Sequence, residues 1–391
     1  MLLSIAYILM LGMLSGWLCK KIKLPSLTGM IITGILLGPY MFNLIDQSIL
    51  DVSAELRKIA LIIILMRAGL SLDIKDLKKV GRPAILMCFV PACFEIIGMI
   101  LIAPKLLGVS ILEAAIMGAV VGAVSPAVIV PKMLKLMEEG YGIKKSIPQL
   151  ILAGASVDDV FVIVMFSAFT GLAQGNALSI SSFINIPLSI ISGIIVGILM
   201  GYLLAYYFQK IHIRDTAKVL ILLCIAFILV TLEDDFSSII PFSALISIMC
   251  IGIALQRKRE MVATRLSLKF NKLWVGSELL LFVLVGATVN ISYLSSAGIT
   301  AIILIFAVLC FRMIGVLLCL VKTNLNRKEK IFCMIGYSPK ATVQAAIGGI
   351  PLAMGLACGN IVLTVAVLAI LITAPLGAFM IETFYKKLLQ K

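Results

Sequence analysis

Long apolar stretches that alternate with short polar segments dominate this sequence. Each stretch has about 18–25 residues, enough for a helix to cross the ~30 Å hydrocarbon core of a bilayer. The stretches are too long for membrane strands and lack the period-two alternation that strands require. The pattern therefore predicts an all-α membrane protein with about thirteen transmembrane helices. We expect them at residues 3–19, 27–43, 54–72, 84–103, 110–131, 148–173, 185–207, 216–232, 238–255, 272–290, 297–321, 331–352 and 358–384.

The basic residues between the stretches support this count. Every odd-numbered stretch is followed by a segment with Lys or Arg, such as 20–23, 132–145 and 386–391, and the segments after even-numbered stretches have few or none. Cytoplasmic loops of membrane proteins carry the excess of Lys and Arg. We therefore expect the N-terminus outside and the C-terminus in the cytoplasm, in the inner (plasma) membrane of the cell.

The same distribution explains the net charge of +14. A nucleic-acid partner would favour one basic stripe or tail, and this sequence has neither, so no nucleic acid is expected. The nine cysteines form no CxxC pair, which predicts neither a disulfide framework nor a zinc site. No cofactor is expected. The single histidine, His212, is expected to be a solvated residue of a cytoplasmic loop.

Five charged residues fall in the middle of expected helices: Glu95, Asp158, Asp159, Arg312 and Lys340. A charge in mid-bilayer costs about 2.5–3.5 kcal/mol, so such residues need partners or a wet cavity and are usually functional. Three acids and two bases at one depth leave one carboxylate spare. A buried ion-pair network that only fixed the packing of helices would not need that spare group.

Asp158 and Asp159 are consecutive on one expected helix, so their side chains diverge by about 100°. One of them is thus free to face the basic residues while the other faces a cavity. The same divergence weighs against an aspartic-protease pair, in which two carboxyl groups share one proton.

Two expected helices contain a Ser-Pro pair in mid-run, at Ser125-Pro126 and at Ser338-Pro339. Proline removes a backbone donor, and the freed backbone groups are tolerated at membrane depth only beside protein or a wet cavity. Interrupted helices at corresponding positions of two halves indicate a transporter site. We therefore expect an inverted-repeat fold with two discontinuous helices, broken at Pro126 and Pro339, that cross near the midplane.

Four segments together resemble a known group of transporters. GASVDDV (154–160) resembles the paired-aspartate motif of the electrogenic branch of the monovalent cation:proton antiporters. VSPAVIVPKML (124–134), LMRAGLSLD (65–73) and SPKATVQAAIG (338–348) resemble the NHA-type sodium/hydrogen exchangers of that branch, in particular bacterial members. The resemblance covers nearly the whole chain.

This resemblance implies exchange of Na⁺, with Li⁺ as a further substrate, for H⁺ by competition at a buried aspartate with alternating access. It implies a cation site at Asp159 with Asp158 beside it, and Arg312 as the basic partner where many relatives carry lysine. The hydroxyl of Ser125 or Ser156 would add oxygen ligands, which suit a hard cation. Glu95 and Lys340 would complete the charge network.

The resemblance also implies a homodimer built from two kinds of domain. The dimer domain would comprise residues 1–82 and 208–296. The transport core would comprise 83–175 and 297–385, with a linker helix at 183–207.

Arg312 leaves the stoichiometry open. If it stays paired with Glu95 or Asp158, one proton is exchanged for one sodium ion. If Asp158 is released and binds a proton, two protons move per sodium ion and transport is electrogenic.

Other functions remain as alternatives. A potassium/proton antiporter or efflux system of the same superfamily would share the fold, and efflux systems usually add a nucleotide-binding domain, for which no GxGxxG follows a strand here. A sodium-coupled organic anion symporter would not need Arg312 and Lys340 beside the carboxylates. An intramembrane enzyme is not expected, because no plausible nucleophile or metal cluster is found.

Overall fold

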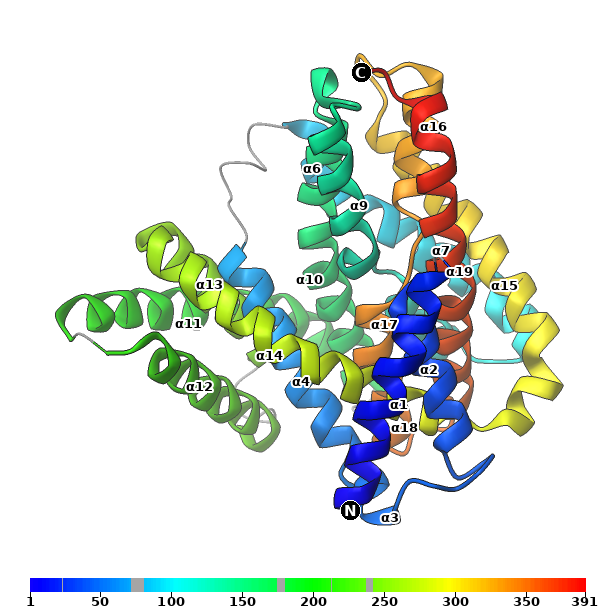
Figure 1. Cartoon of the computed structure of the whole chain (residues 1–391), viewed down its shortest axis with the longest axis horizontal. Helices are drawn as coiled ribbons and strands as arrows, with labels where there is room; N and C mark the ends of the chain where they lie inside the picture. The colour runs from blue at the N-terminus through cyan, green and yellow to red at the C-terminus, as the bar shows by residue number, and fades with distance from the viewer. Residues whose placement is uncertain (23, 72–80, 174–179, 212, 237–241) are drawn as a thin grey trace. The chain divides into compact units, whose positions relative to one another are not determined.

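The computed structural model describes residues 1–22, 24–71, 81–173, 180–211, 213–236 and 242–391, and in these ranges every regular element is a helix (Figure 1). The helices form two compact units. The first unit comprises 1–57, 75–173 and 279–391, and the second comprises 58–74 and 174–278. An all-α fold is thus confirmed for the described part of the chain.

The first unit holds the regions with the expected charges. Its helices are α1 (Leu2–Lys21), α2 (Ser26–Leu37), α3 (Gln47–Asp51), α6 (Arg82–Met87), α7 (Val90–Leu107), α8 (Ile111–Val121), α9 (Pro126–Glu139), η1 (Ile143–Lys145), α10 (Ile147–Ala173), α15 (Ile291–Cys319), α16 (Arg327–Gly336), α17 (Thr342–Ile347), α18 (Ile350–Ala353) and α19 (Gly359–Leu388).

The second unit contains α11 (Ile180–Lys210), α12 (Asp215–Phe236) and α13 (Ala244–Lys258). Helices α4 (Ser53–Ser71) and α14 (Glu260–Ala287) each contribute to both units. Close packing of α11 on α13 depends on small residues: a Cβ at Gly197 would lie 2.5 Å from the carbonyl oxygen of Ser247. Small residues at such positions let two membrane helices approach, because there is no hydrophobic driving force between helices in lipid.

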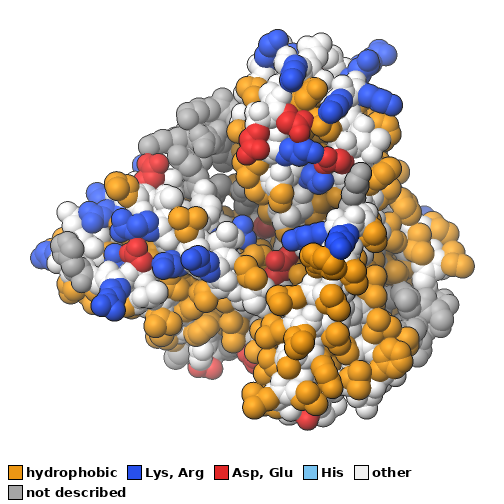
Figure 2. Space-filling view, viewed as in Figure 1, with side chains coloured by type: hydrophobic (Ala, Val, Ile, Leu, Met, Phe, Trp, Pro, Cys, Tyr) orange, Lys and Arg blue, Asp and Glu red, His pale blue; other side chains and the backbone are white. Residues whose placement is uncertain are grey.

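Nine helical segments of the described ranges are long and apolar enough to cross a bilayer. Two shorter apolar helical stretches, Ser26–Leu37 and Thr342–Ala353, accompany them. Over the first unit, Figure 2 shows hydrophobic side chains gathered where α1 and α2 lie and basic side chains at the end where the C-terminus lies. The exact number of thirteen spans stays a prediction.

Both expected interruptions are present. Residues 122–125 separate α8 from α9, which begins at Pro126, and residues 337–341 separate α16 from α17 and include Pro339. The two breaks meet: the backbone N–H of Ser125 donates to the carbonyl oxygen of Pro339 at 2.8 Å. The sequence also predicts one continuous helix at 84–103, and that detail is wrong, because the chain breaks between α6 and α7 just before Pro91.

The broken helices leave carbonyl groups without their usual backbone donor, and nearby side chains supply one. In an α-helix each carbonyl accepts from the N–H four residues later, and proline has none. Met87, four residues before Pro91, accepts from the hydroxyl of Tyr337 at 3.3 Å. Gly122, four residues before Pro126, accepts from Arg312, and Ile335, four residues before Pro339, accepts from the Ser338 hydroxyl.

Candidate functional site

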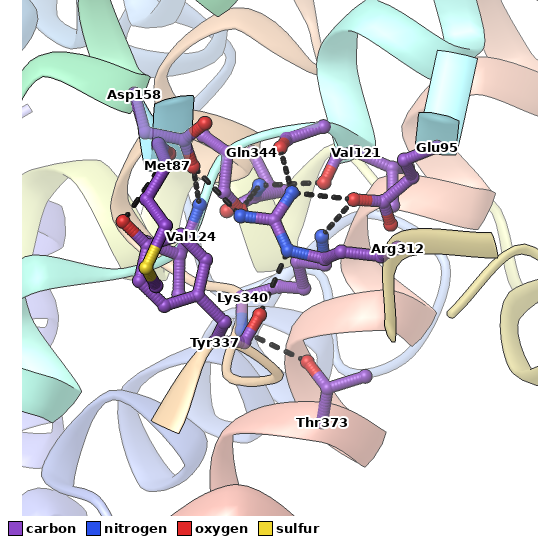
Figure 3. Close-up of polar contacts among 12 residues, drawn as sticks. Met87, Glu95, Val121, Val124, Asp158, Arg312, Tyr337, Lys340, Gln344 and Thr373 are labelled. Carbon is purple, nitrogen blue, oxygen red and sulfur yellow. Dashed lines mark hydrogen bonds and ion pairs between the residues drawn. The ribbon is translucent and has the colours of Figure 1, made fainter. Parts of the chain in front are cut away.

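Four of the five expected intramembrane charges meet in one buried cluster (Figure 3). Glu95 comes from α7, Asp158 from α10, Arg312 from α15, and Lys340 from the break between α16 and α17. Each of these residues is at most 1% exposed. Residues separated by more than 200 positions in the chain thus lie in one cluster of ion pairs.

Close packing of α7 on α15 brings the first acid and the arginine together. A Cβ at Gly98 would lie 2.7 Å from the ring of Phe311, and one at Gly315 would lie 2.8 Å from Cα of Pro91. Both glycines therefore allow the two helices to approach within one turn of Glu95 and Arg312.

Arg312 is at the centre of the cluster. Its Nη1 atom donates to Oε2 of Glu95 at 2.7 Å, and its Nη2 atom donates to Oδ2 of Asp158 at 2.7 Å. Its Nε atom donates to the carbonyl oxygen of Tyr337 at 2.8 Å, and Nη1 also donates to the carbonyl oxygen of Gly122. The guanidinium group therefore neutralises two acids and also caps the carboxyl ends of two half-helices, where the helix dipole favours a cation.

Lys340 completes the charge balance of the cluster. Its Nζ atom donates to Oε2 of Glu95 at 2.5 Å. Its backbone N–H donates to Oγ1 of Thr373 on α19 at 2.9 Å, which fixes the break at this residue. Glu95 thus accepts from both bases, whereas Asp158 accepts from Arg312 and from the backbone N–H of Val124 at 2.9 Å.

Asp159 does not take part in this network. It follows Asp158 on α10 and is 9% exposed, the most exposed of the five charged residues. Its Oδ1 atom has no hydrogen-bond partner among the residues that the structure describes. The two carboxylates therefore have different surroundings: one is held by an arginine and a backbone N–H, and the other is the spare acid of the cluster.

The oxygen donors around the breaks suit a hard monovalent cation. Besides Oδ1 of Asp159, several buried oxygen atoms of the described residues have no hydrogen-bond partner, including Oδ1 of Asp158, Oγ of Ser125 and Oγ1 of Thr342. Carboxylate, hydroxyl and amide oxygens are the ligands that hard cations prefer. Ser156 lies on α10, but its side chain is outside the described residues, as is His212.

The sequence missed three members of the site. Tyr337, Thr373 and Gln344 are uncharged, so they do not stand out in an apolar sequence as the charged residues do. A signal exists for the first, because Tyr337 stands directly before the Ser-Pro pair. For Thr373 the sequence contains no comparable signal, because its contact depends on how α19 packs.

Two broken helices that meet beside a buried carboxylate, with no ion pair to it among the described residues, are the arrangement expected of an ion-coupled antiporter. The chain belongs to the sodium/hydrogen exchanger family: the family described as "Sodium/hydrogen exchanger, transmembrane" matches residues 7–387. It is a family of membrane transporters, so the chain is a multi-pass membrane protein of the sodium/proton antiporter class, as the sequence predicts.

Curated relatives agree with this assignment. Sodium/hydrogen exchanger 9B2 of Xenopus tropicalis is 33% identical over 411 residues, covering 100% of this chain and 75% of the relative. Human sodium/hydrogen exchanger 9B2 is 34% identical over 383 residues, covering 94% of this chain and 70% of the relative. Human sodium/hydrogen exchanger 9B1 is 32% identical over 384 residues, with 94% and 73% covered.

A solved structure confirms the fold. The sodium proton antiporter MjNhaP1 of Methanocaldococcus jannaschii superposes with a TM-score of 0.86 over 99% of this chain and 98% of that chain. The sequence identity is 21%, so this similarity concerns the fold alone.

Proposed function

We propose that this antiporter carries its ions at Asp159, which binds either a proton or a dehydrated Na⁺ or Li⁺ and never both. The observation that carries the proposal is the contrast between two neighbouring acids. Oδ2 of Asp158 accepts from Arg312 at 2.7 Å and from the N–H of Val124 at 2.9 Å, whereas Asp159 makes no contact with either base among the described residues. A carboxylate already neutralised by an arginine has little to gain from a sodium ion. The spare carboxylate has no such competitor.

Coupling of the two ions follows from the cost of moving a bare charge. An unpaired carboxylate inside a bilayer is costly. Asp159 is therefore expected to move between the two sides of the membrane only when a proton or a cation neutralises it. Each turnover in one direction with sodium must be matched by a return with a proton, which is antiport.

The oxygen shell of the cation is proposed to come from both broken helices. Ser125, Ser156 and backbone carbonyls near the break would supply ligands with Asp159, and water would complete the shell. The ion pairs of Arg312 with Glu95 and Asp158, and of Lys340 with Glu95, would hold the breaks in place while the cation binds and leaves.

The domain assignment and the assembly are part of the proposal. Residues 83–175 and 297–385 would form the moving transport core, and 1–82 and 208–296 the dimer domain of a homodimer. Helix 183–207 would connect them. The protein would lie in the inner (plasma) membrane with its C-terminus in the cytoplasm, as the distribution of basic residues indicates.

The test is sodium-driven proton movement in proteoliposomes. A sodium gradient across vesicles that contain the protein should change the internal pH, read with a trapped pH-sensitive dye. Asp159→Asn should abolish the change, while Asp51→Asn, at an exposed position on α3, should leave it intact. Wild-type rates from Asp159→Asn would contradict the proposal. A response to potassium and not to sodium would favour the potassium/proton alternative.

A further inference from the structure

Residues 122–125, between α8 and α9, are held by several different parts of the first unit. The carbonyl of Gly122 accepts from Arg312, and the N–H of Ser125 donates to Pro339. The peptide group between Ala123 and Val124 is bound at both edges. Its carbonyl oxygen accepts from Nε2 of Gln344 at 2.8 Å, and its N–H donates to Oδ2 of Asp158 at 2.9 Å.

Gln344 lies on α17 and is fully buried. Its Nε2 atom also donates to the carbonyl oxygen of Val121 at 3.1 Å, so both amide hydrogens are used on the carboxyl end of α8 (Figure 3). This fixes the orientation of the amide, because a flipped amide would place its oxygen against two carbonyl oxygens. Glutamine is therefore required here as a donor of two hydrogen bonds.

A hydrogen bond to a carbonyl polarises its peptide group and strengthens the bond that the N–H of the same group donates. Gln344 and Asp158 are therefore linked through one peptide group: Gln344 donates to its carbonyl oxygen, and Asp158 accepts from its N–H. The contact of Gln344 with Ala123 also fixes where the N–H of Val124 points. The position of Asp158 in its ion pair with Arg312 thus depends on an amide from the other broken helix.

We propose that Gln344 is a positioning residue for ion exchange: through the Ala123–Val124 peptide it keeps Asp158 on Arg312 and thereby leaves Asp159 as the one free carboxylate. This inference rests on the proposed role of Asp159. It assigns to an uncharged residue of α17 the task of keeping the two neighbouring acids different.

The experiment measures sodium binding in purified protein, and it measures whether the effects of substitutions at Gln344 and at Asp158 on the melting temperature depend on each other. Gln344→Met keeps the size of the side chain and removes both donors, and Gln344→Glu is a second variant of similar shape without the two donors. Gln149→Met on α10 is the control, because it makes the same chemical change at a glutamine that makes none of these contacts. The readouts are the sodium-induced rise in melting temperature in detergent and the apparent KM and maximal rate in proteoliposomes.

Loss of two buried hydrogen bonds is expected to weaken the apparent affinity for sodium roughly tenfold, with a smaller effect on maximal rate. Gln149→Met should bind sodium as the wild type does. In an Asp158→Asn background, Gln344→Met should lower the melting temperature less than it does alone. The acid that it positions is already gone, and only the loss of the bonds to the carbonyls of Val121 and Ala123 remains.

Two results would overturn the inference. One is an unchanged sodium affinity in whichever of the two Gln344 variants folds, which would leave the residue a packing role only. The other is full additivity of Gln344→Met and Asp158→Asn in melting temperature. Failure of the proposed function would look different, because Asp159→Asn would then retain exchange whatever the Gln344 variants do.

Discussion

Nη2 of Arg312 lies 2.7 Å from Oδ2 of Asp158, and both side chains are fully buried. The same arginine holds Glu95 at 2.7 Å, so one guanidinium group accounts for two of the three acids in the site. Arginine stays protonated at any physiological pH and forms such forked contacts better than lysine. The pairing therefore leaves Asp159 as the one acid of the site without an ion pair among the described residues.

Breaking this pair should cost stability. Removal of one partner of a buried ion pair leaves an uncompensated charge and typically costs about 3–5 kcal/mol. We expect Asp158→Asn to lower the melting temperature in detergent markedly. Glu382→Gln is the control. Glu382 pairs with Lys132 at 2.7 Å and also with Lys135, but its side chain is 37% exposed, and exposed pairs contribute at most about 1 kcal/mol each. Equal losses from both variants would argue against the structural role of Asp158.

The junction of the two breaks should be sensitive to a single methyl group. A Cβ at Gly377 on α19 would lie 2.5 Å from Cγ of Pro339 and 3.0 Å from the hydroxyl of Ser338. Overpacking of this kind costs about 1–3 kcal/mol and shifts the backbone. Gly377→Ala should therefore reduce both exchange and melting temperature.

The matched control is Gly171→Ala on α10, where an added Cβ would meet nothing within 4 Å. This variant should retain wild-type exchange and stability in the same assays. If Gly377→Ala behaved like Gly171→Ala, the second break would tolerate displacement, and its geometry could not be critical for transport.

Competition at Asp159 makes a kinetic prediction. If proton and sodium share one carboxylate, acidification should raise the apparent KM for sodium and leave the maximal rate at saturating sodium nearly unchanged. Initial rates over a matrix of sodium concentration and pH would show this. A fall in maximal rate at constant KM would instead indicate protonation at a separate regulatory group.

The charged residues that cluster in the structure stand out in the sequence, because charges inside a membrane are few and costly. Glu95, Arg312 and Lys340 could be grouped by depth alone, and the Ser-Pro pairs mark the breaks between α8 and α9 and between α16 and α17. The specific pairing could not be predicted. Glu95 contacts both bases while Asp158 contacts only Arg312, and the Glu95–Arg312 contact depends on how α7 and α15 pack at Gly98 and Gly315.

The features that the sequence did not predict, the break at 88–89 and the role of Gln344, both depend on backbone groups. The break at 88–89 could not be predicted from Pro91, because proline is common in the first turn of an uninterrupted helix as well as next to a break. The role of Gln344 depends on carbonyl groups freed at another helix, and these cannot be paired with a donor until the tertiary structure is known. A useful rule nevertheless emerges: the residue four positions before a mid-membrane proline exposes a carbonyl, as Met87 and Gly122 do here.

The stoichiometry of exchange follows from what Arg312 holds. For two protons to move per sodium ion, a second group must take up and release a proton during the cycle. Asp158 is the obvious acid, but it accepts from Arg312 at 2.7 Å and from Val124 at 2.9 Å, and both contacts stabilise its charged form. Arg312 itself cannot release a proton, and Lys340 is paired with Glu95 at 2.5 Å, a contact that favours its charged form. We therefore expect one proton per sodium ion and electroneutral exchange.

The reversal point in proteoliposomes checks this expectation. With equal and parallel sodium and proton gradients, net flux should be zero, and a potential imposed with potassium and valinomycin should not shift this null point. Arg312→Lys supplies a partner that is able to lose its proton, so this variant should acquire a voltage-dependent null point if it folds and transports. A wild-type null point that moves with voltage would mean that Asp158 or Lys340 also carries a proton. In that case the ion pairs seen here would have to open in the other half of the cycle.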